Sequence, residues 1–149
     1  MQGKCLCGEV RFSLSGELPD LYQCHCSLCR KVSGSSSNSA MKIERAQLRW
    51  DAGEALVRKY QTDSGFKSHF CSRCGSPLPN PTARDSAWWV PVGLLENGEG
   101  LRIAAHMFVA SSAPWDVIAG GVEQFDEMPD DAQLQRLFHT VPGSGQEFP

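Results

Sequence analysis

Cysteine is the residue type with the clearest chemical potential in this chain, because all seven cysteines lie in three tight clusters. The clusters are Cys5 and Cys7, then Cys24, Cys26 and Cys29, and then Cys71 and Cys74. Four and three are the ligand counts of a closed structural zinc site and of an open, reactive one. The spacing therefore predicts two zinc ions per chain, one held by the first and third clusters together and one held by the middle cluster.

The first and third clusters have the features of two halves of a zinc site. Cys71 and Cys74 are separated by two residues, so both sulfurs can reach one metal from a tight turn, and Gly75 follows them. In a strand, the one-residue gap between Cys5 and Cys7 puts both side chains on the same face. A zinc ion joining these four thiolates would close a long loop and supply folding free energy directly, so we expect a structural site.

The middle cluster differs, because no fourth cysteine remains for it. Cys24, Cys26 and Cys29 lie within six residues and can bind one face of a metal as a tripod, and the cations Arg30 and Lys31 follow. Cations beside thiols favour the thiolate form and could attract an anionic ligand. We expect these three cysteines to form an open, catalytic zinc site.

The alternative for the middle cluster is a second closed, structural site, with another side chain in the fourth position. His25 and His69 are the histidines to consider for that position. If the segment is extended, however, His25 points away from the face that carries Cys24 and Cys26. We expect His69 to lie behind the ligands rather than among them.

Composition and charge exclude several classes of protein. The formal net charge is -3 and no stretch of clustered Lys and Arg is present, which argues against nucleic-acid binding. No run approaches the ~20 apolar residues of a membrane span, and no signal peptide is visible. We therefore expect a cytoplasmic protein, in which clustered cysteines bind metal rather than form disulfides. The oligomeric expectation is a monomer or a homodimer.

The regular pattern of the sequence is mostly an alternation of apolar and polar residues, which predicts an all-β fold of short strands. The predicted strands cover residues 10–14, 48–50, 56–60, 67–70, 88–94 and 101–103. One short helix is predicted near the end, where Pro129 and two aspartates precede Leu134, Leu137 and Phe138 on one face. The serine-rich stretch 33–39 is predicted to be a loop. At 149 residues we expect one zinc domain over residues 1–141, with a flexible tail at 142–149.

These motifs resemble those of the glutathione-dependent formaldehyde-activating enzyme (GFA) family, which also contains centromere protein V. The resembling motifs are Gly3-x-Cys5-x-Cys7-Gly8-x-Val10-x-Phe12, Cys24-His25-Cys26-Ser27-x-Cys29-Arg30-Lys31, Phe70-Cys71-x-x-Cys74-Gly75-Ser76, and the later His106 and Pro114-Trp115. The resemblance implies a β-tent fold, in which several small coiled sheets surround zinc. It also implies the same division of the cysteines into a structural set and a catalytic set.

The activity implied by the resemblance is carbon–sulfur chemistry that joins glutathione to formaldehyde as S-hydroxymethylglutathione. Our leading hypothesis is accordingly a zinc-dependent carbon–sulfur lyase whose partner is a small thiol such as glutathione. A second hypothesis is a non-enzymatic zinc-binding scaffold or binding module. A third is a redox- or zinc-responsive protein in which the tripod loses its metal on oxidation. A fourth protein ligand would favour the second hypothesis, and reversible disulfide formation would favour the third.

Overall fold

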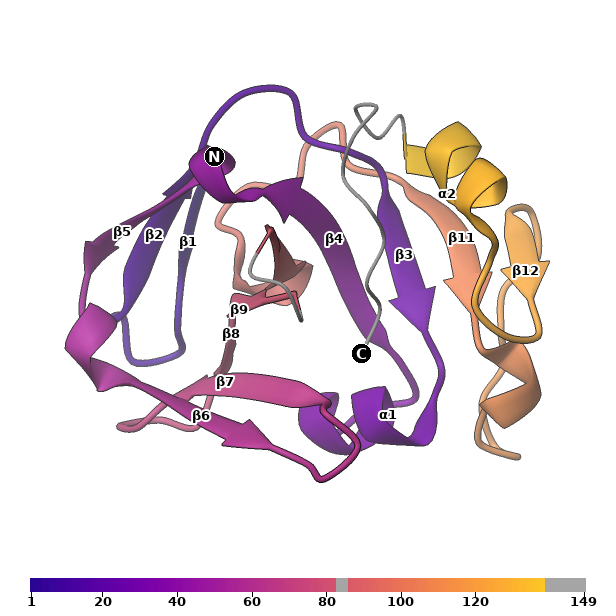
Figure 1. Cartoon of the computed structure of the whole chain (residues 1–149), viewed down its shortest axis with the longest axis horizontal. Coiled ribbons are helices and arrows are strands. Elements are labelled where there is room, and N and C mark those ends of the chain that lie inside the picture. Colours follow the sequence, from indigo (N-terminus) through magenta and orange to yellow (C-terminus); the bar gives the residue numbers. More distant parts are fainter. Residues whose placement is uncertain (83–85, 139–149) are drawn as a thin grey trace. The chain divides into compact units, whose positions relative to one another are not determined.

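The structure is a computed structural model, and it describes residues 1–82 and 86–138. Most of its regular elements are strands, which confirms the mainly-β prediction (Figure 1). The chain divides into two compact units, which are described separately below. The first contains residues 1–18 and 42–99, and the second contains residues 19–41 and the described chain from Gly100 onward. The single domain predicted over residues 1–141 stays a prediction, and the predicted tail at 142–149 lies outside the described residues.

The first unit contains two small antiparallel sheets (Figure 1). One has the order β1-β2-β5, with bounds Gln2–Lys4, Arg11–Leu14 and Leu48–Ala52. The other has the order β6-β7-β8, with bounds Val57–Gln61, Lys67–Cys71 and Pro77–Leu78. Two further strands, β9 (Asn80–Pro81) and β10 (Ala87–Pro91), pair with each other. Short 3-10 helices cover Arg45–Gln47, Glu54–Leu56 and Val92–Leu94.

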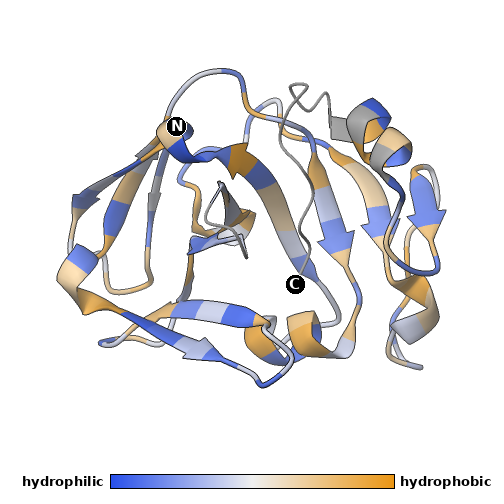
Figure 2. Cartoon of the chain, in the orientation of Figure 1, coloured by the Kyte–Doolittle hydropathy of each residue, from blue (hydrophilic) through white to orange (hydrophobic). Residues whose placement is uncertain are grey.

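Apolar residues on alternate positions of these strands build the core of the first unit. Phe12 is fully buried, and its ring meets Trp50 edge-on with 5.9 Å between the ring centroids. Trp50 in turn meets Trp88 of β10 at the same distance. Strand β6, by contrast, is largely hydrophilic and exposed after Val57 (Figure 2). The core therefore lies toward β2, β5 and β10 and not along β6.

The second unit is a sheet of order β12-β11-β3-β4 with two helices. Its elements are β3 (Leu21–Cys24), α1 (Ser27–Ser33), β4 (Asn38–Glu44, which continues into the first unit), β11 (Ile103–Met107), a 3-10 helix at Val109–Ser111, β12 (Glu123–Phe125) and α2 (Asp131–Phe138). Strand β11 is parallel to both β3 and β12, whereas β3 and β4 are antiparallel. Parallel neighbours bring segments that are far apart in the chain side by side, and here they bring residues 103–107 beside the strand that carries Cys24.

The predicted C-terminal helix is present as α2, and a reciprocal pair of hydrogen bonds explains where it starts. The Gln133 amide N–H donates to the Asp130 carboxylate, and the Asp130 N–H donates to the Gln133 side chain, each at 2.8 Å. This capping arrangement satisfies donors that the first helical turn leaves free. Leu134 is buried, as the predicted apolar face requires.

Three local predictions need correction. Residues 33–39 are not all loop, because Ser33 ends helix α1 and Asn38 begins β4. The strand predicted at 88–94 ends at Pro91, where a 3-10 helix follows, because proline has no N–H to continue the ladder. The strand predicted at 101–103 instead begins at Ile103.

No helix within residues 1–82 and 86–138 is both long and apolar enough to cross a membrane. The cytoplasmic location and the monomer or homodimer expected from the sequence stay predictions.

Candidate metal centres

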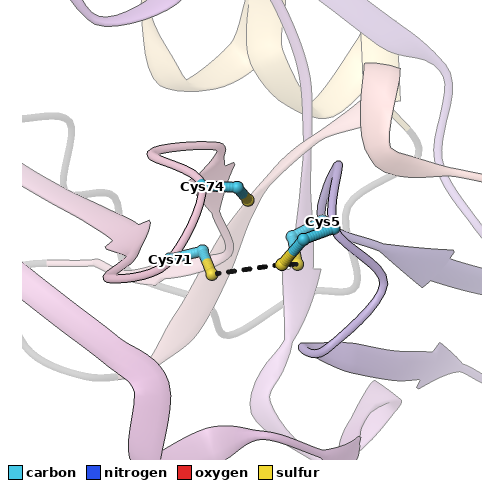
Figure 3. Close-up of side chains that lie close together, drawn as sticks. Cys5, Cys71 and Cys74 are labelled. Carbon is cyan, nitrogen blue, oxygen red and sulfur yellow. Dashed lines mark hydrogen bonds between the residues drawn. The ribbon is translucent and has the colours of Figure 1, made fainter.

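The first and third cysteine clusters come together in the first unit. The sulfur atoms of Cys5, Cys7, Cys71 and Cys74 all lie within 4.8 Å of one another. Figure 3 shows the sulfurs of three of them turned toward a common centre. The Sγ–Sγ distance is 3.4 Å between Cys5 and Cys7 and 4.0 Å between Cys7 and Cys71. Tetrahedral zinc with bonds of about 2.3 Å needs sulfurs about 3.8 Å apart, so the donor set and its dimensions fit a zinc ion.

Two turns of similar construction carry these four cysteines. The Gly8 N–H donates to the Cys5 carbonyl at 2.9 Å, and the Gly75 N–H donates to the Cys71 carbonyl at 2.8 Å. Both glycines have a positive φ, near 75°, which residues with a side chain rarely adopt. The Val10 N–H also points at Cys5 Sγ, at 3.3 Å. The glycine after each cysteine pair thus allows the chain to fold back on its sulfurs, as the sequence indicated.

Ser76 connects the two turns, a role that the cysteine spacing does not reveal. Its Oγ accepts a hydrogen bond from the Leu6 N–H at 2.9 Å and lies 3.4 Å from Cys74 Sγ. The Ser76 hydroxyl, helped by its backbone N–H, lowers the pKa of Cys74 to about 5. On the same turns, Arg73 forms an ion pair with Glu9 at 2.7 Å. These contacts hold the two turns at the spacing that a shared metal requires.

The four-cysteine site is part of the core of the first unit. Cys5 and Cys71 are buried together with Val10 and Leu78, and Trp50 packs against this cluster. Cys7 is exposed, so one edge of the site reaches the surface. Two of the four candidate ligands are thus core residues, so a metal held there would also stabilise the fold.

The middle cluster forms a separate site in the second unit. The sulfurs of Cys24, Cys26 and Cys29 also lie within 4.8 Å of one another. Cys24 is the last residue of β3, and Cys26 is the N-cap of helix α1, where its Sγ accepts a hydrogen bond from the Cys29 N–H at 3.4 Å. Helix α1 closes at Gly34, which has a left-handed conformation. The change from strand to helix within three residues is what brings the three sulfurs together.

Electrostatics within the tripod favour one thiolate shared by three sulfurs when no metal is bound. Hydrogen bonds from the thiols of Cys24 and Cys29 lower the pKa of Cys26 to about 2. The same contact with Cys26 raises the pKa of Cys24 to about 12, and contact with Cys24 and Cys26 raises the pKa of Cys29. Burial, and then the nearby cysteines, raise the pKa of the Tyr22 phenol. A cation is needed before all three thiols can ionise together, which suits a metal site.

Among the described residues, no histidine, carboxylate or fourth cysteine joins the tripod's ligand atoms. His25 lies between two of the ligands, but its Nδ1 is 2.7 Å from Asp116 Oδ2 and its Nε2 is 3.0 Å from His106 Nδ1. Both ring nitrogens are therefore already engaged. The three-plus-four grouping of cysteines predicted from spacing is present. The contacts of His25 with His106 and Asp116 were not predicted, because no local pattern marks them.

Comparisons with known proteins agree with this arrangement. The sequence profile of the glutathione-dependent formaldehyde-activating enzyme family matches residues 1–111. A Halomonas elongata protein named "Putative glutathione-dependent formaldehyde-activating enzyme" is 33% identical over 84 residues, which cover 52% of this chain and 54% of that protein. The match thus spans about half the length of that relative.

A crystal structure of a Rhodobacter sphaeroides protein, a structural-genomics target, has a similar fold. It superposes with a TM-score of 0.55 and 26% identity, over 83% of this chain and 99% of that one. The family profile covers both cysteine sites of this chain. We conclude that the chain belongs to the glutathione-dependent formaldehyde-activating enzyme family.

Proposed function

We propose that this protein is a zinc-dependent carbon–sulfur lyase that acts on a small thiol adduct such as S-hydroxymethylglutathione. The observation that carries the proposal is the incomplete ligand set of Cys24, Cys26 and Cys29 among the described residues. Zinc prefers four ligands, and three protein ligands plus one open position is the pattern of catalytic zinc sites. The four-cysteine site is already complete, so we assign it the structural role.

Packing of the four-cysteine site supports this division of roles. In that site, Cys5 and Cys71 are core residues of the first unit. In the tripod, Cys24 is buried and Cys26 and Cys29 are partly covered. The chemistry that zinc supplies at such an open position is to hold a small thiol as its thiolate at neutral pH.

The residues after the tripod favour an anionic thiol. Arg30 follows Cys29 directly, and its Nη2 donates to the Ser111 carbonyl at 3.3 Å. Its Nε is buried and has no hydrogen-bond partner among the described residues. Lys31, next in the chain, is exposed. Two cations beside the tripod suit a thiol that carries carboxylates, and glutathione is such a thiol.

The reaction that fits is reversible cleavage of the carbon–sulfur bond. In S-hydroxymethylglutathione, the hydroxyl passes its proton to solvent water as the carbon becomes the carbonyl of formaldehyde. The carbon–sulfur bond breaks, its electron pair stays on sulfur, and glutathione leaves as the thiolate. In the reverse direction the thiolate adds to formaldehyde. The chain's own part is to bind and orient the thiol beside the tripod, because correct positioning lowers the barrier for such an addition.

The test is thiol binding to the cobalt-substituted protein. Adding glutathione should strengthen the sulfur-to-cobalt charge-transfer band, whereas S-methylglutathione, whose thiol is blocked, should leave the band unchanged. The variant Cys74→Ser should keep the response if it folds, and Cys26→Ser should lose it. If glutathione and other small thiols at millimolar concentration leave the spectrum unchanged, the lyase proposal is wrong and a binding module takes its place. Release of formaldehyde from S-hydroxymethylglutathione, with Arg30→Ala as the weakened variant, then tests turnover.

A further inference from the structure

Behind the tripod, the second unit contains a buried chain of three polar side chains. Asp116 Oδ2 lies 2.7 Å from His25 Nδ1, and His25 Nε2 lies 3.0 Å from His106 Nδ1. His25 is 2% exposed, His106 is 4% exposed and the Asp116 side chain is 7% exposed. Because a carboxylate only accepts hydrogen bonds, the Nδ1–H of His25 donates to Asp116. Burial of three such groups is costly unless they bond to one another, so their arrangement is specific.

This network is attached directly to the segment that carries two of the ligands. His25 stands between Cys24 and Cys26, and its backbone N–H donates to the Met107 carbonyl at 2.9 Å. Cys24 itself lies opposite Met107 in the parallel pairing of β3 and β11. His106 precedes Met107 in β11. Strand β11 therefore holds the segment around His25 in two ways, through the backbone of Met107 and through the side chain of His106.

The loop that provides Asp116 also contacts helix α1, which carries the third cysteine of the tripod. The Asp116 N–H donates to the Ala113 carbonyl at 2.9 Å, which fixes the turn from which the carboxylate extends. Four residues before Asp116, the Ser112 N–H donates to the Val109 carbonyl and ends the 3-10 helix Val109–Ser111. The Ser111 carbonyl accepts the hydrogen bond from Arg30, which lies on α1 directly after Cys29. One short segment therefore touches both α1 and the His25 ring.

Such an arrangement can orient ligands without coordinating the metal. With both nitrogens engaged, the His25 ring acts as an anchor for the chain between two cysteines. A site with only three protein ligands depends strongly on having them in place beforehand, because ordering them during binding costs conformational entropy. Hydrogen-bonded residues behind metal ligands commonly fulfil this role.

We propose that Asp116 and His106 are positioning residues for the tripod: acting through the His25 ring, they hold Cys24 and Cys26 in the metal-binding arrangement. The inference rests on the zinc binding at the tripod that the proposed function assumes, but not on the carbon–sulfur reaction.

The experiment measures zinc affinity at both sites of the full chain by competition with a coloured chelator. Asp116→Asn and His106→Gln should each weaken tripod zinc binding, by about 10- to 100-fold, the usual effect of changing a residue behind a metal ligand. The four-cysteine site of the same molecule is the internal reference and should be unchanged. Asp20→Asn is the matched control, because it also removes a paired carboxylate from the second unit. Asp20 forms an ion pair with Arg102 at 2.9 Å and directly precedes β3, at the end of that strand away from Cys24. Asp116→Glu keeps the charge and should retain part of the affinity.

Two results would overturn the proposal. Unchanged tripod affinity in both network variants would show that the cysteines are held without the network. Equal loss of zinc from both sites, including through failure to fold, would show that the network only supports the fold. If wild-type protein holds no zinc at the tripod, this inference and the proposed function fail together. If the variants lose tripod zinc as expected but wild type neither binds glutathione nor releases formaldehyde, the positioning role stands and the lyase proposal fails.

Discussion

Removing Cys71 and Cys74 together should destabilise the protein much more than removing Cys24 and Cys26 together. The first pair supplies all the ligands on one side of the four-cysteine site, so in the variant Cys71→Ser/Cys74→Ser a metal can no longer join the two turns. The second pair belongs to a site whose three ligands lie within six residues of one another. The two double variants remove the same number of thiols and differ mainly in what the thiols connect.

The size of the difference follows from the loop that the four-cysteine site closes. Cys7 and Cys71 are 64 residues apart in sequence. Treated as a cross-link, a metal between them removes chain entropy from the unfolded state that corresponds to about 4 kcal/mol at 25 °C. Domains are stable by only about 5–15 kcal/mol, so this contribution is a large share of the total. The tripod closes no such loop, so loss of its metal should leave the conformational entropy of the unfolded chain almost unchanged.

Urea unfolding followed by circular dichroism, with zinc present, measures this difference. At a slope of about 2 kcal/mol per molar urea, a loss of 4 kcal/mol moves the midpoint by about 2 M. A strong chelator should lower the midpoint of wild type by a similar amount and leave that of Cys71→Ser/Cys74→Ser unchanged. Equal midpoints for the two double variants, or no effect of the chelator on wild type, would refute the assignment of the four-cysteine site as the structural one.

Three further predictions follow from the geometry of the sites. Metal analysis of gently purified protein should approach two zinc ions per chain, with the tripod zinc leaving first during chelation; one zinc per chain with a freely alkylated tripod would contradict this. In folded, tripod-metal-free protein, alkylation of Cys26 should be nearly independent of pH between about pH 5 and pH 9, because a pKa of about 2 keeps it a thiolate throughout. Cys24, with its pKa raised to about 12, should react slowly and faster with each rise in pH, and mass spectrometry that finds the opposite order would refute the shared-thiolate description. Gly53→Ala should destabilise the protein by more than the roughly 1–2 kcal/mol that a left-handed backbone costs a residue with a side chain, measured as the shift in urea midpoint. The reason is that φ is +73° there and the added Cβ would also clash with the Glu9 carbonyl oxygen beside the first cysteine turn. Gly93→Ala, which meets open space, is the matched control.

Local spacing explains why the two groups of cysteines could be predicted from the sequence. The gaps within each cluster, and the glycines after Cys7 and Cys74, depend only on backbone geometry over a few residues. The first cluster could be paired with the third because the two together have four cysteines, the number of ligands in a closed zinc site. Alternation predicted β2 and β5 for the same reason, since each buries alternate positions. The strands predicted at 56–60 and 67–70 correspond to β6 and β7, although β6 is exposed after Val57.

Contacts between distant segments explain what the sequence did not reveal. His25 meets its partners 81 and 91 residues further along, through a parallel pairing that no local pattern marks. Helix α1 has no buried residue and only seven residues, so it has no apolar periodicity; Cys26 and Gly34 cap its ends instead. Cys26 is both a candidate ligand and the helix N-cap, and only the first role was predicted from the sequence.

The order in which the thiols leave the ribosome follows from where they lie in the chain. At about 5–20 residues per second, the 64 residues between Cys7 and Cys71 take roughly 3 to 13 s to synthesise. Once Cys29 has been made, the nascent chain carries the two thiols of the first cluster and all three of the tripod, but not the two of the third cluster. The four-cysteine site can therefore be completed only after Cys74 has been made, whereas the tripod, whose candidate ligands are all local, can be completed before the rest of the chain exists.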